Sequence, residues 1–198
     1  MLKLERLYKS ETALEILQEA ILSGDIESGT EITQTEAALS LGVSRMPVRE
    51  ALISLEYCGL LERLPGQHVR VAELDEESIK NIFHDVAILV GEIIKNFNPE
   101  DFRELSFFES QLDFHRALIA KTKSPLRKKF LEIFSEIYLP FVLKYSENLE
   151  DINAKFKKFL AILVNFNQRN LVYNDFYNYY SILADELIKI RKRNGEKN

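Results

Sequence analysis

Two arginines four residues apart are the side chains in this sequence best suited to recognising a polyanion. The stretch VSRMPVREAL (43–52) places Arg45 and Arg49 one helical turn apart, with Pro47 between them. Positions i and i+4 lie on one face of a helix, and a proline in the first turn costs no hydrogen bond. Arginine forms bidentate hydrogen bonds with guanine O6/N7 and with phosphate. The pair therefore predicts contact with nucleic acid from a rigid helix start.

The overall charge of the chain opposes general attraction to nucleic acid. The 198 residues include 26 Lys/Arg and 31 Asp/Glu, which gives a net charge of −5. Residues 1–73 hold 7 basic and 12 acidic side chains, and the remainder holds 19 of each. Binding to nucleic acid would therefore depend on a local patch and not on the overall field.

Composition and apolar runs indicate the class of protein. The lone Cys58 excludes an internal disulfide and fits a reducing compartment. The first ten residues, MLKLERLYKS, carry charges throughout and do not resemble a signal peptide. The apolar run VAILV (86–90) is much shorter than the roughly 18 residues of a membrane span. We expect a soluble cytoplasmic protein with no membrane partner.

The segment before about residue 73 contains short and well-delimited elements. Ser10 is a good N-cap and Gly24 a good stop, which predicts the first helix between them. Thr33 and Glu36 have the spacing of a capping box, which predicts a second, short helix that ends at Gly42.

The next two elements complete a winged helix-turn-helix. Ser44 caps a helix expected over 44–58, and the alternating segment over 60–74 is typical of a β-hairpin. Two short helices joined by SLGVS (40–44) form a helix-turn-helix, whose second helix would present its first turn to a major groove. The hairpin would act as a wing whose tip, GQH (66–68), approaches a minor groove.

After Glu76 the sequence has the periodicity of successive long helices. We expect these helices over 76–96, 98–121, from 125 onward, over 148–168 and over 171–192. Asn98 would cap the second of them, and Pro140 should kink or split the third. The predicted fold is mainly α, with a winged helix-turn-helix of three helices plus a β-hairpin over 1–73. A C-terminal antiparallel α-helical bundle follows over 74–198.

The segment ITQTEAALSLGVSRMPVREALISLEYCGLLERLPGQHVRV (32–71) resembles the winged helix-turn-helix of GntR-family transcriptional regulators. The resemblance covers about residues 10–72 and implies operator contacts from the recognition helix, its N-terminal flank and the wing. His68 stands where the family has its second wing glycine, so this side chain either stacks over a sugar or faces solvent. The residues expected to contact DNA are Thr33, Ser44, Arg45, Met46, Pro47, Arg49, Gly66, Gln67 and His68.

The helical half is similar to the FadR-type (FCD) ligand-binding domains that follow this headpiece. The resemblance rests on QLDFHRALIA and implies a small organic acid beside a divalent metal, which an Asp and three His hold. Gln111 stands at the Asp position, and His115 is the only family ligand that matches. The other two His positions fall at Phe159 and around Tyr180 or Ser181.

A metal needs three or four suitable ligands, so a single His predicts no bound metal and no cofactor. Two interpretations of His115 remain open. It is either a core histidine satisfied by Gln111 or a tyrosine hydroxyl, or part of a metal site completed by His84 or Asp113. An effector pocket would be apolar, since two valines replace charged family residues, and would take a small apolar or aromatic effector. The residues expected to line it are Val86, Val90, Gln111, His115, Phe159 and Tyr180.

Three functional hypotheses follow. The first is a dimeric transcriptional regulator, a repressor, that binds an inverted-repeat operator of double-stranded DNA and responds to a small-molecule effector. The second keeps the DNA-binding half but makes the bundle a homodimerisation module without an effector. The third is a helical-bundle enzyme, for which the sequence offers no Glu-x-x-His pair, nucleophile elbow or Gly-rich phosphate loop. We therefore expect a regulator and not an enzyme.

Overall fold

The computed structural model divides the chain into two compact units, and each is described by itself. The first unit comprises Met1–Asp75 together with Arg191–Asn198, and the second comprises Glu76–Ile190. The structure describes residues 2–65, 68–98, 100–101, 104, 108, 110–164 and 173–195. The predicted fold class, a winged helix-turn-helix joined to a helical bundle, is confirmed.

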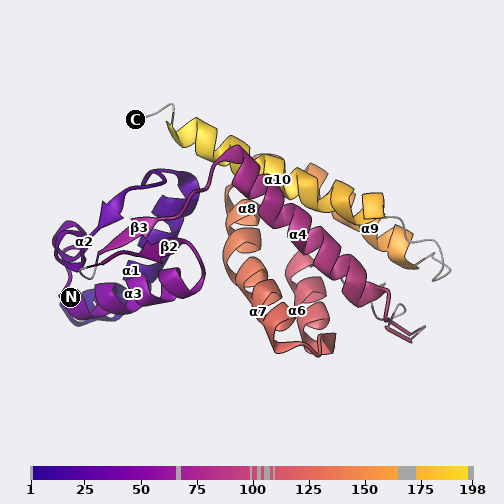
Figure 1. The fold of residues 1–198 in the computed structure, drawn as a ribbon, viewed down its shortest axis with the longest axis horizontal. Coiled ribbons are helices and arrows are strands. Elements are labelled where there is room, and N and C mark those ends of the chain that lie inside the picture. Colours follow the sequence, from indigo (N-terminus) through magenta and orange to yellow (C-terminus); the bar gives the residue numbers. More distant parts are fainter. Residues whose placement is uncertain are drawn as a thin grey trace. The chain divides into compact units, whose positions relative to one another are not determined.

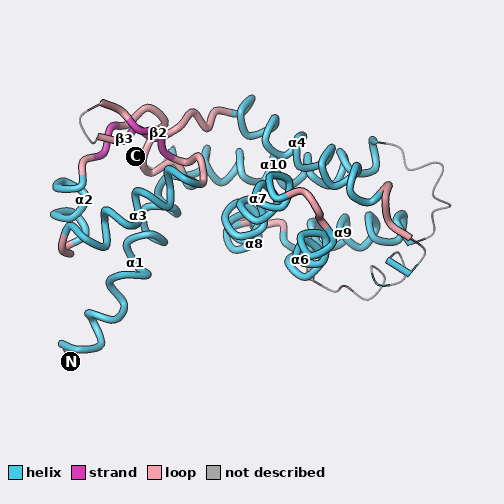
Figure 2. The backbone as a smooth tube through the Cα atoms, turned by 60° about the horizontal axis from the view of Figure 1, so that its bottom comes forward, coloured by secondary structure: helices cyan, strands magenta, loops and turns pink. Residues whose placement is uncertain are grey.

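The first unit is a winged helix-turn-helix built from three helices and a small antiparallel sheet (Figures 1 and 2). Its helices are α1 (Leu2–Ser23), α2 (Gln34–Leu41) and α3 (Arg45–Tyr57). Its strands are β1 (Glu31–Ile32), β2 (Leu61–Arg63) and β3 (Val69–Val71), in the order β1-β3-β2. Helix α1 packs against α3 through buried side chains that include Leu17, Ile21 and Leu55. This packing gives α3 a fixed support.

The first helix starts earlier than the sequence predicted. We expected Ser10 to cap it, but α1 begins at Leu2, so Ser10 lies inside the helix. The preceding residues are mostly strong helix formers and contain no Gly or Pro to stop the helix. At its other end, Arg191 Nη1 donates to the carbonyls of Ile21 (2.6 Å) and Leu22 (3.0 Å). A cation thereby satisfies carbonyls that the last turn leaves without an intrahelical partner.

The ends of α2 and α3 are set by caps that the sequence predicted. The Thr33 hydroxyl accepts the Glu36 N–H (3.2 Å), which is one of the two bonds of a capping box, and donates to Glu36 Oε2 (2.7 Å) in place of the other. Gly42 ends α2 with φ of 64°, a left-handed conformation that suits glycine. Cys58 is the C-cap of α3, and Gly59 follows with φ of 76°. These caps fix the turn that separates the two helices.

We expect Thr33→Ala to lower the free energy of unfolding by about 1 kcal/mol, because the N-cap hydrogen bond is lost. Urea unfolding of the intact chain measures this. Thr35, an exposed residue in the first turn of α2, provides the matched control Thr35→Ala, which should leave the unfolding curve almost unchanged. Equal losses in the two variants would contradict the capping role.

The sheet has one strand that we did not predict. The predicted hairpin is present as β2 and β3, with Leu61 paired with Val71 and Arg63 with Val69. Strand β1 adds to the other side of β3 through pairs of Glu31 with Arg70 and Ile32 with Val69. A strand of two residues is too short to produce a recognisable alternation, so the sequence pattern carries no signal for it.

The second unit is a helical bundle (Figure 1). Its elements are α4 (Glu76–Ile94), α6 (Gln111–Lys121), α7 (Pro125–Ile133), the π-helix η1 (Phe134–Tyr138), α8 (Leu139–Tyr145), α9 (Leu149–Val164) and α10 (Tyr173–Gly195). Helices α4 and α10 lie side by side in both views, and a Cβ atom added at Gly91 would stand 3.5 Å from the Phe176 ring. An added methyl group at that glycine would make an ordinary van der Waals contact with the ring.

Two expected helices differ from the structure in detail. We expected one helix over 98–121, but α6 begins at Gln111, where the Ser110 hydroxyl accepts the N–H of Leu112. We expected Pro140 to kink or split the third helix. The π-helix η1 precedes this proline, which has no N–H for the Glu136 carbonyl. The helix therefore continues through a wider turn.

Candidate functional site

The recognition helix α3 presents its arginines to solvent because its opposite face is buried. Val48, Leu52 and Leu55 are buried, which fixes the rotation of the helix. Arg45 and Arg49 are both exposed and lie one turn apart at its start. Ser44 has the extended backbone of an N-cap but makes no side-chain capping hydrogen bond. The first turn of α3 thus offers two guanidinium groups, a hydroxyl and its own N–H groups to a ligand.

The arginines of this unit fall into two classes by pairing. Within the described part of the chain, Arg45 and Arg49 have no hydrogen bond or ion pair. Arg63 is instead held by Glu56, and Arg70 pairs with Glu62 at 2.7 Å. The glutamates raise the pKa of both hairpin arginines through hydrogen bonds. The local basic patch that the acidic unit requires is therefore centred on α3.

The other predicted contact residues around α3 differ in availability. Met46 is 61% exposed on the first turn, so its thioether chain is open to an apolar partner such as a thymine methyl group. Pro47 is half-buried beside it. Thr33 lies at the start of α2, but its hydroxyl is already occupied by Glu36. Of these three, Met46 is the most accessible.

The predicted wing tip is described only at its last residue. Gly66 and Gln67 lie outside the described residues. His68 follows them directly before β3, and its side chain is half exposed. Its Nδ1 lies 4.0 Å from Glu31 Oε2.

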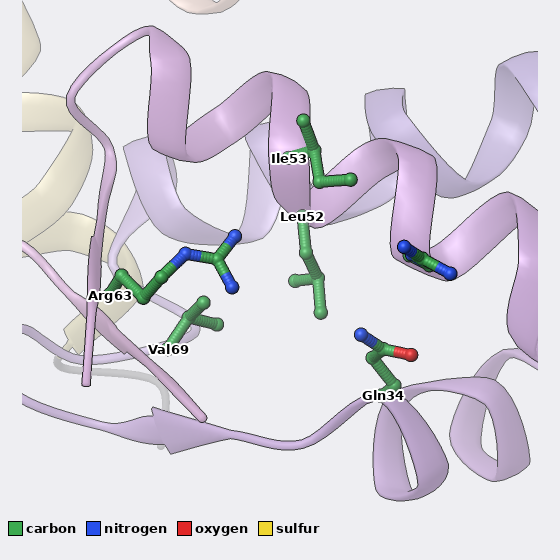
Figure 3. A pocket seen from close by; sticks show the side chains of 6 residues that line it. Gln34, Leu52, Ile53, Arg63 and Val69 are labelled. Carbon is green, nitrogen blue, oxygen red and sulfur yellow. The ribbon is translucent and has the colours of Figure 1, made fainter. Parts of the chain in front are cut away.

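Two residues beside α3 were not predicted as site residues. Gln34 opens α2 and Arg63 ends β2, and both line a hollow together with Arg49 (Figure 3). No pattern in the sequence placed Arg63 beside Arg49, because that approach depends on how the hairpin folds back onto α3. No pattern in the sequence placed Gln34 next to Arg49, because that approach depends on the helix crossing.

All six residues of the predicted effector pocket are buried in the second unit. Each is at most 3% exposed, and four are completely covered. They are Val86, Val90, Gln111, His115, Phe159 and Tyr180. Aromatic rings surround them: Phe114 makes edge-to-face contacts with His115 (5.2 Å), Phe156 (5.6 Å) and Phe159 (5.6 Å) between ring centroids. Such contacts are those of a packed aromatic core.

The polar atoms of this core are satisfied by one another. His115 Nδ1 lies 2.7 Å from the Gln111 carbonyl, and Nε2 lies 2.9 Å from the Tyr180 hydroxyl. The Tyr179 hydroxyl donates to Gln111 Oε1, and Gln111 Nε2 donates to Asn153 Oδ1 at 3.0 Å. Burial lowers the pKa of His115 to about 4, so the imidazole is neutral at physiological pH. Tyr179 and Asn153 complete this network and were not predicted.

The two residues considered as further metal ligands have other charged neighbours. Asp113 is exposed and pairs with Arg116 at 3.0 Å, and His84 Nδ1 lies 3.7 Å from a carboxylate oxygen of Asp85. Across the described ranges, no three His, Cys, Asp or Glu side chains are grouped so that they could hold a metal ion. Both ring nitrogens of His115 lie within hydrogen-bonding distance of protein groups, the Gln111 carbonyl and the Tyr180 hydroxyl.

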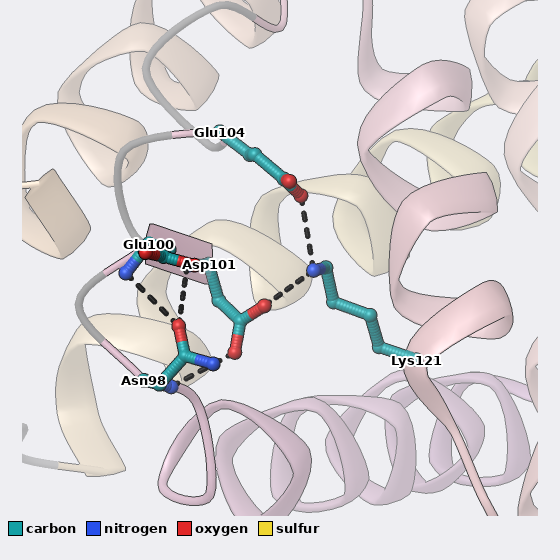
Figure 4. A network of polar contacts seen from close by, with 5 residues as sticks. All are labelled: Asn98, Glu100, Asp101, Glu104 and Lys121. Carbon is teal, nitrogen blue, oxygen red and sulfur yellow. Dashed lines mark hydrogen bonds and ion pairs between the residues drawn. The ribbon is translucent and has the colours of Figure 1, made fainter.

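A second polar cluster lies where α6 ends (Figure 4). The Asn98 Oδ1 accepts the N–H groups of Glu100 and Asp101, both at 2.9 Å, which is the predicted capping role of Asn98. Lys121 from α6 forms ion pairs with Asp101 and with Glu104, the latter at 2.9 Å. The hydrogen bond from Lys121 lowers the pKa of Asp101. This cluster links α6 to the turn after α4.

Similarity to known proteins is strongest in the first unit. Residues 9–71 match the family described as "Bacterial regulatory proteins, gntR family". The chain is 31% identical over 100 residues to the uncharacterized HTH-type transcriptional regulator YdhC of Bacillus subtilis, and the match covers 49% of this chain and 44% of YdhC. The matched part thus spans less than half of that relative.

Solved structures share the fold of the whole chain. Lar, which controls the expression of the Listeria monocytogenes agr system and mediates virulence, is 15% identical with a TM-score of 0.57. The likeness covers 91% of this chain and 96% of Lar. A transcriptional regulator GntR from Rhodococcus sp. RHA1 is 17% identical with a TM-score of 0.52, over 92% of this chain and 97% of that protein. None of the described helices is both long and apolar enough to cross a membrane.

Proposed function

We propose that this chain, whose residues 9–71 belong to the gntR family of bacterial regulatory proteins, is a DNA-binding transcriptional regulator that represses by binding an operator. The observation that carries the proposal is the first turn of α3. Its two arginines are exposed and unpaired among the described residues, on a helix whose other face is buried. Arg45 and Arg49 would contact guanine edges or phosphates in the major groove. Ser44 and Met46 would complete the contact surface.

We further propose that the protein binds DNA as a homodimer through its helical unit. One recognition helix reads only a few base pairs, and a two-fold dimer on an inverted repeat multiplies specificity. Light scattering of the purified protein should give twice the chain mass of 23.0 kDa. A monomer that binds a single half-site with full affinity would overturn this part of the proposal.

The buried network around His115 favours a helical unit that dimerises without an effector at the predicted positions. A ligand there would have to displace paired polar groups and well-packed rings, which costs free energy. The competing proposal is a sensor for a small apolar or aromatic molecule. Both proposals keep the DNA-binding half unchanged.

We expect neither zinc, nickel nor a panel of cellular metabolites to raise the melting temperature of the protein. Binding to the native state alone would raise it by mass action, so a thermal-shift screen measures the effect. Any hit is then repeated with Leu112→Trp, at a half-buried position of α6 close to the network, and with Ile16→Ala in the first unit as control. A hit that only Leu112→Trp removes would favour the sensor role.

A further inference from the structure

A hollow of about 270 Å³ lies beside the recognition helix, between α2, α3 and the sheet (Figure 3). Its lining residues are Gln34, Arg49, Leu52, Ile53, Arg63 and Val69. Leu52 and Val69 are buried and form an apolar floor, whereas the polar members stand at the rim. We call this hollow the Arg49–Arg63 notch. Its rim carries two guanidinium groups and one amide, which are all hydrogen-bond donors.

Arg63 is held in a fixed orientation at the notch. Its Nε donates to Glu56 Oε1 at 2.8 Å, and its Nη2 donates to Glu56 Oε2, so the planar group is gripped along one edge. A guanidinium has five N–H donors, and this bidentate pair uses two of them. Figure 3 shows the Arg63 side chain reaching from its strand towards Leu52. The donors on the remaining edge are therefore available to a ligand in the notch.

The other two donors come from the helix-turn-helix itself. Gln34 is the first residue of α2, and its amide extends towards Leu52 from the opposite side in Figure 3. Arg49 lies on the same exposed face of α3 as Arg45, and both are proposed to contact the major groove. A ligand in the notch would thus lie next to the major-groove contact and not in place of it.

We propose that the Arg49–Arg63 notch binds one phosphate of the DNA backbone in each half-site, with Arg63 and Gln34 as contact residues and Glu56 as the positioning residue. The inference rests on the proposed DNA-binding function. Two arginines and one glutamate leave the notch with a net positive charge, and arginine forks match phosphate oxygens bidentately. Contacts to phosphates fix the register of a protein on the duplex. Arg63 would therefore set how α3 enters the groove.

Arg70 supplies a matched control within the same sheet. It is exposed like Arg63 and also pairs with a glutamate, through a single hydrogen bond from Nη2 to Glu62 Oε2 at 2.7 Å, but it does not line the notch. Replacing either arginine by glutamine removes one positive charge and one ion pair. Only the loss of Arg63 removes a donor from the notch.

The test is the salt dependence of binding, measured by fluorescence anisotropy on an operator selected from random DNA. Each phosphate contact contributes about 0.9 to the slope of log K against log salt concentration. Arg63→Gln should lower the slope by about that amount per half-site and weaken binding to operator and random DNA alike. Arg70→Gln should leave the slope unchanged. An unchanged slope in Arg63→Gln, or equal reductions in both variants, would overturn the proposal.

A second measurement identifies the phosphate. A neutral methylphosphonate is placed at each backbone position of the operator in turn. It should weaken DNA binding by the wild-type protein at one position per half-site, and Arg63→Gln should not show this effect. If Arg63→Gln melts below the wild type, Gln34→Ala replaces it in the same scan. An effect that persists in the variant would overturn the assignment. Chloride and phosphate salts of equal ionic strength should give equal affinities; a specific loss in phosphate that Arg63→Gln abolishes would assign the notch to free phosphate instead.

The results of these experiments test the phosphate contact in the notch and the DNA-binding function separately. If Arg49→Ala weakens specific binding to the operator and Arg63→Gln does not, the proposed phosphate contact in the notch is wrong, and the proposed regulator function stands. Failure of the wild type to bind any DNA would overturn both.

Discussion

Arg45→Ala and Arg49→Ala should each weaken specific binding to the selected operator by about 1–3 kcal/mol, since a bidentate contact to a base or phosphate is lost. Both side chains are exposed and have no partner among the described residues, so truncation leaves no buried group unpaired. The two residues share one turn of α3, and their effects should therefore not be additive. Titration by fluorescence anisotropy measures each affinity.

The control for these variants is Arg70→Ala, which removes an equal charge from the sheet at a site paired with Glu62. Affinity for the operator should stay close to that of the wild type in this variant. Operator binding that survives in a folded dimer carrying Arg49→Ala would contradict the role given to α3. An equal loss in all three variants would indicate general charge attraction and not recognition.

The stability of the protein should fall as the pH falls from about 6.5 to about 4, because His115 is buried as a neutral imidazole. In the folded state the pKa of His115 is about 4, below the ordinary value of 6.5 that the unfolded chain would show. Between these two values the unfolded state binds a proton that the folded state does not. The neutral imidazole therefore contributes its full stabilisation above pH 6.5. As the pH falls from 6.5 to about 4, the free energy of unfolding decreases by about 3 kcal/mol in total.

Urea unfolding at a series of pH values measures this dependence. His115→Gln cannot titrate, so its stability should change less across the same interval than that of the wild type. His84→Gln is the matched control, since His84 is only partly buried and should leave the dependence intact. If the wild type and His115→Gln lose stability in parallel, the buried neutral histidine is not the source.

Local signals in the sequence were sufficient to predict α2, α3 and the hairpin of the first unit. Thr33, Gly42 and Gly59 are caps and stops whose effect is decided within a few residues, so the boundaries of α2 and α3 followed from them. Ser10 was misleading because a good cap residue is tolerated inside a helix when strong helix formers precede it. Strand β1 exists only through its pairing with β3, which no local pattern reveals.

The second unit shows where sequence reasoning reaches its limit. The burial of His115 was predicted from its position, but its partners depend on how α6, α9 and α10 pack together. Tyr179 and Asn153 could not be assigned to the network before the helices were placed. The π-helix at Phe134–Tyr138 likewise depends on packing, with Pro140 as its only local signal.

The notch combines both kinds of information. Arg49 was identified from its spacing alone, whereas Arg63 and Gln34 join it only because the hairpin and α2 fold back onto α3. Two glutamates also affect the charge around α3. Glu56 and Glu62 contribute to the acidic balance of residues 1–73, yet in the structure they pair with the hairpin arginines. The negative net charge therefore says little about the field at the start of α3.

The most direct test of the account is selection of bound sequences from a randomised double-stranded DNA library by the purified wild-type protein. We expect enrichment of an inverted repeat whose half-sites are separated by about one turn of the DNA helix, 10–10.5 base pairs, or a multiple of it. The double variant Arg45→Ala/Arg49→Ala serves as the parallel selection and should enrich nothing. A wild-type pool without a common motif, or the same motif from both proteins, would contradict the claim that α3 reads an operator.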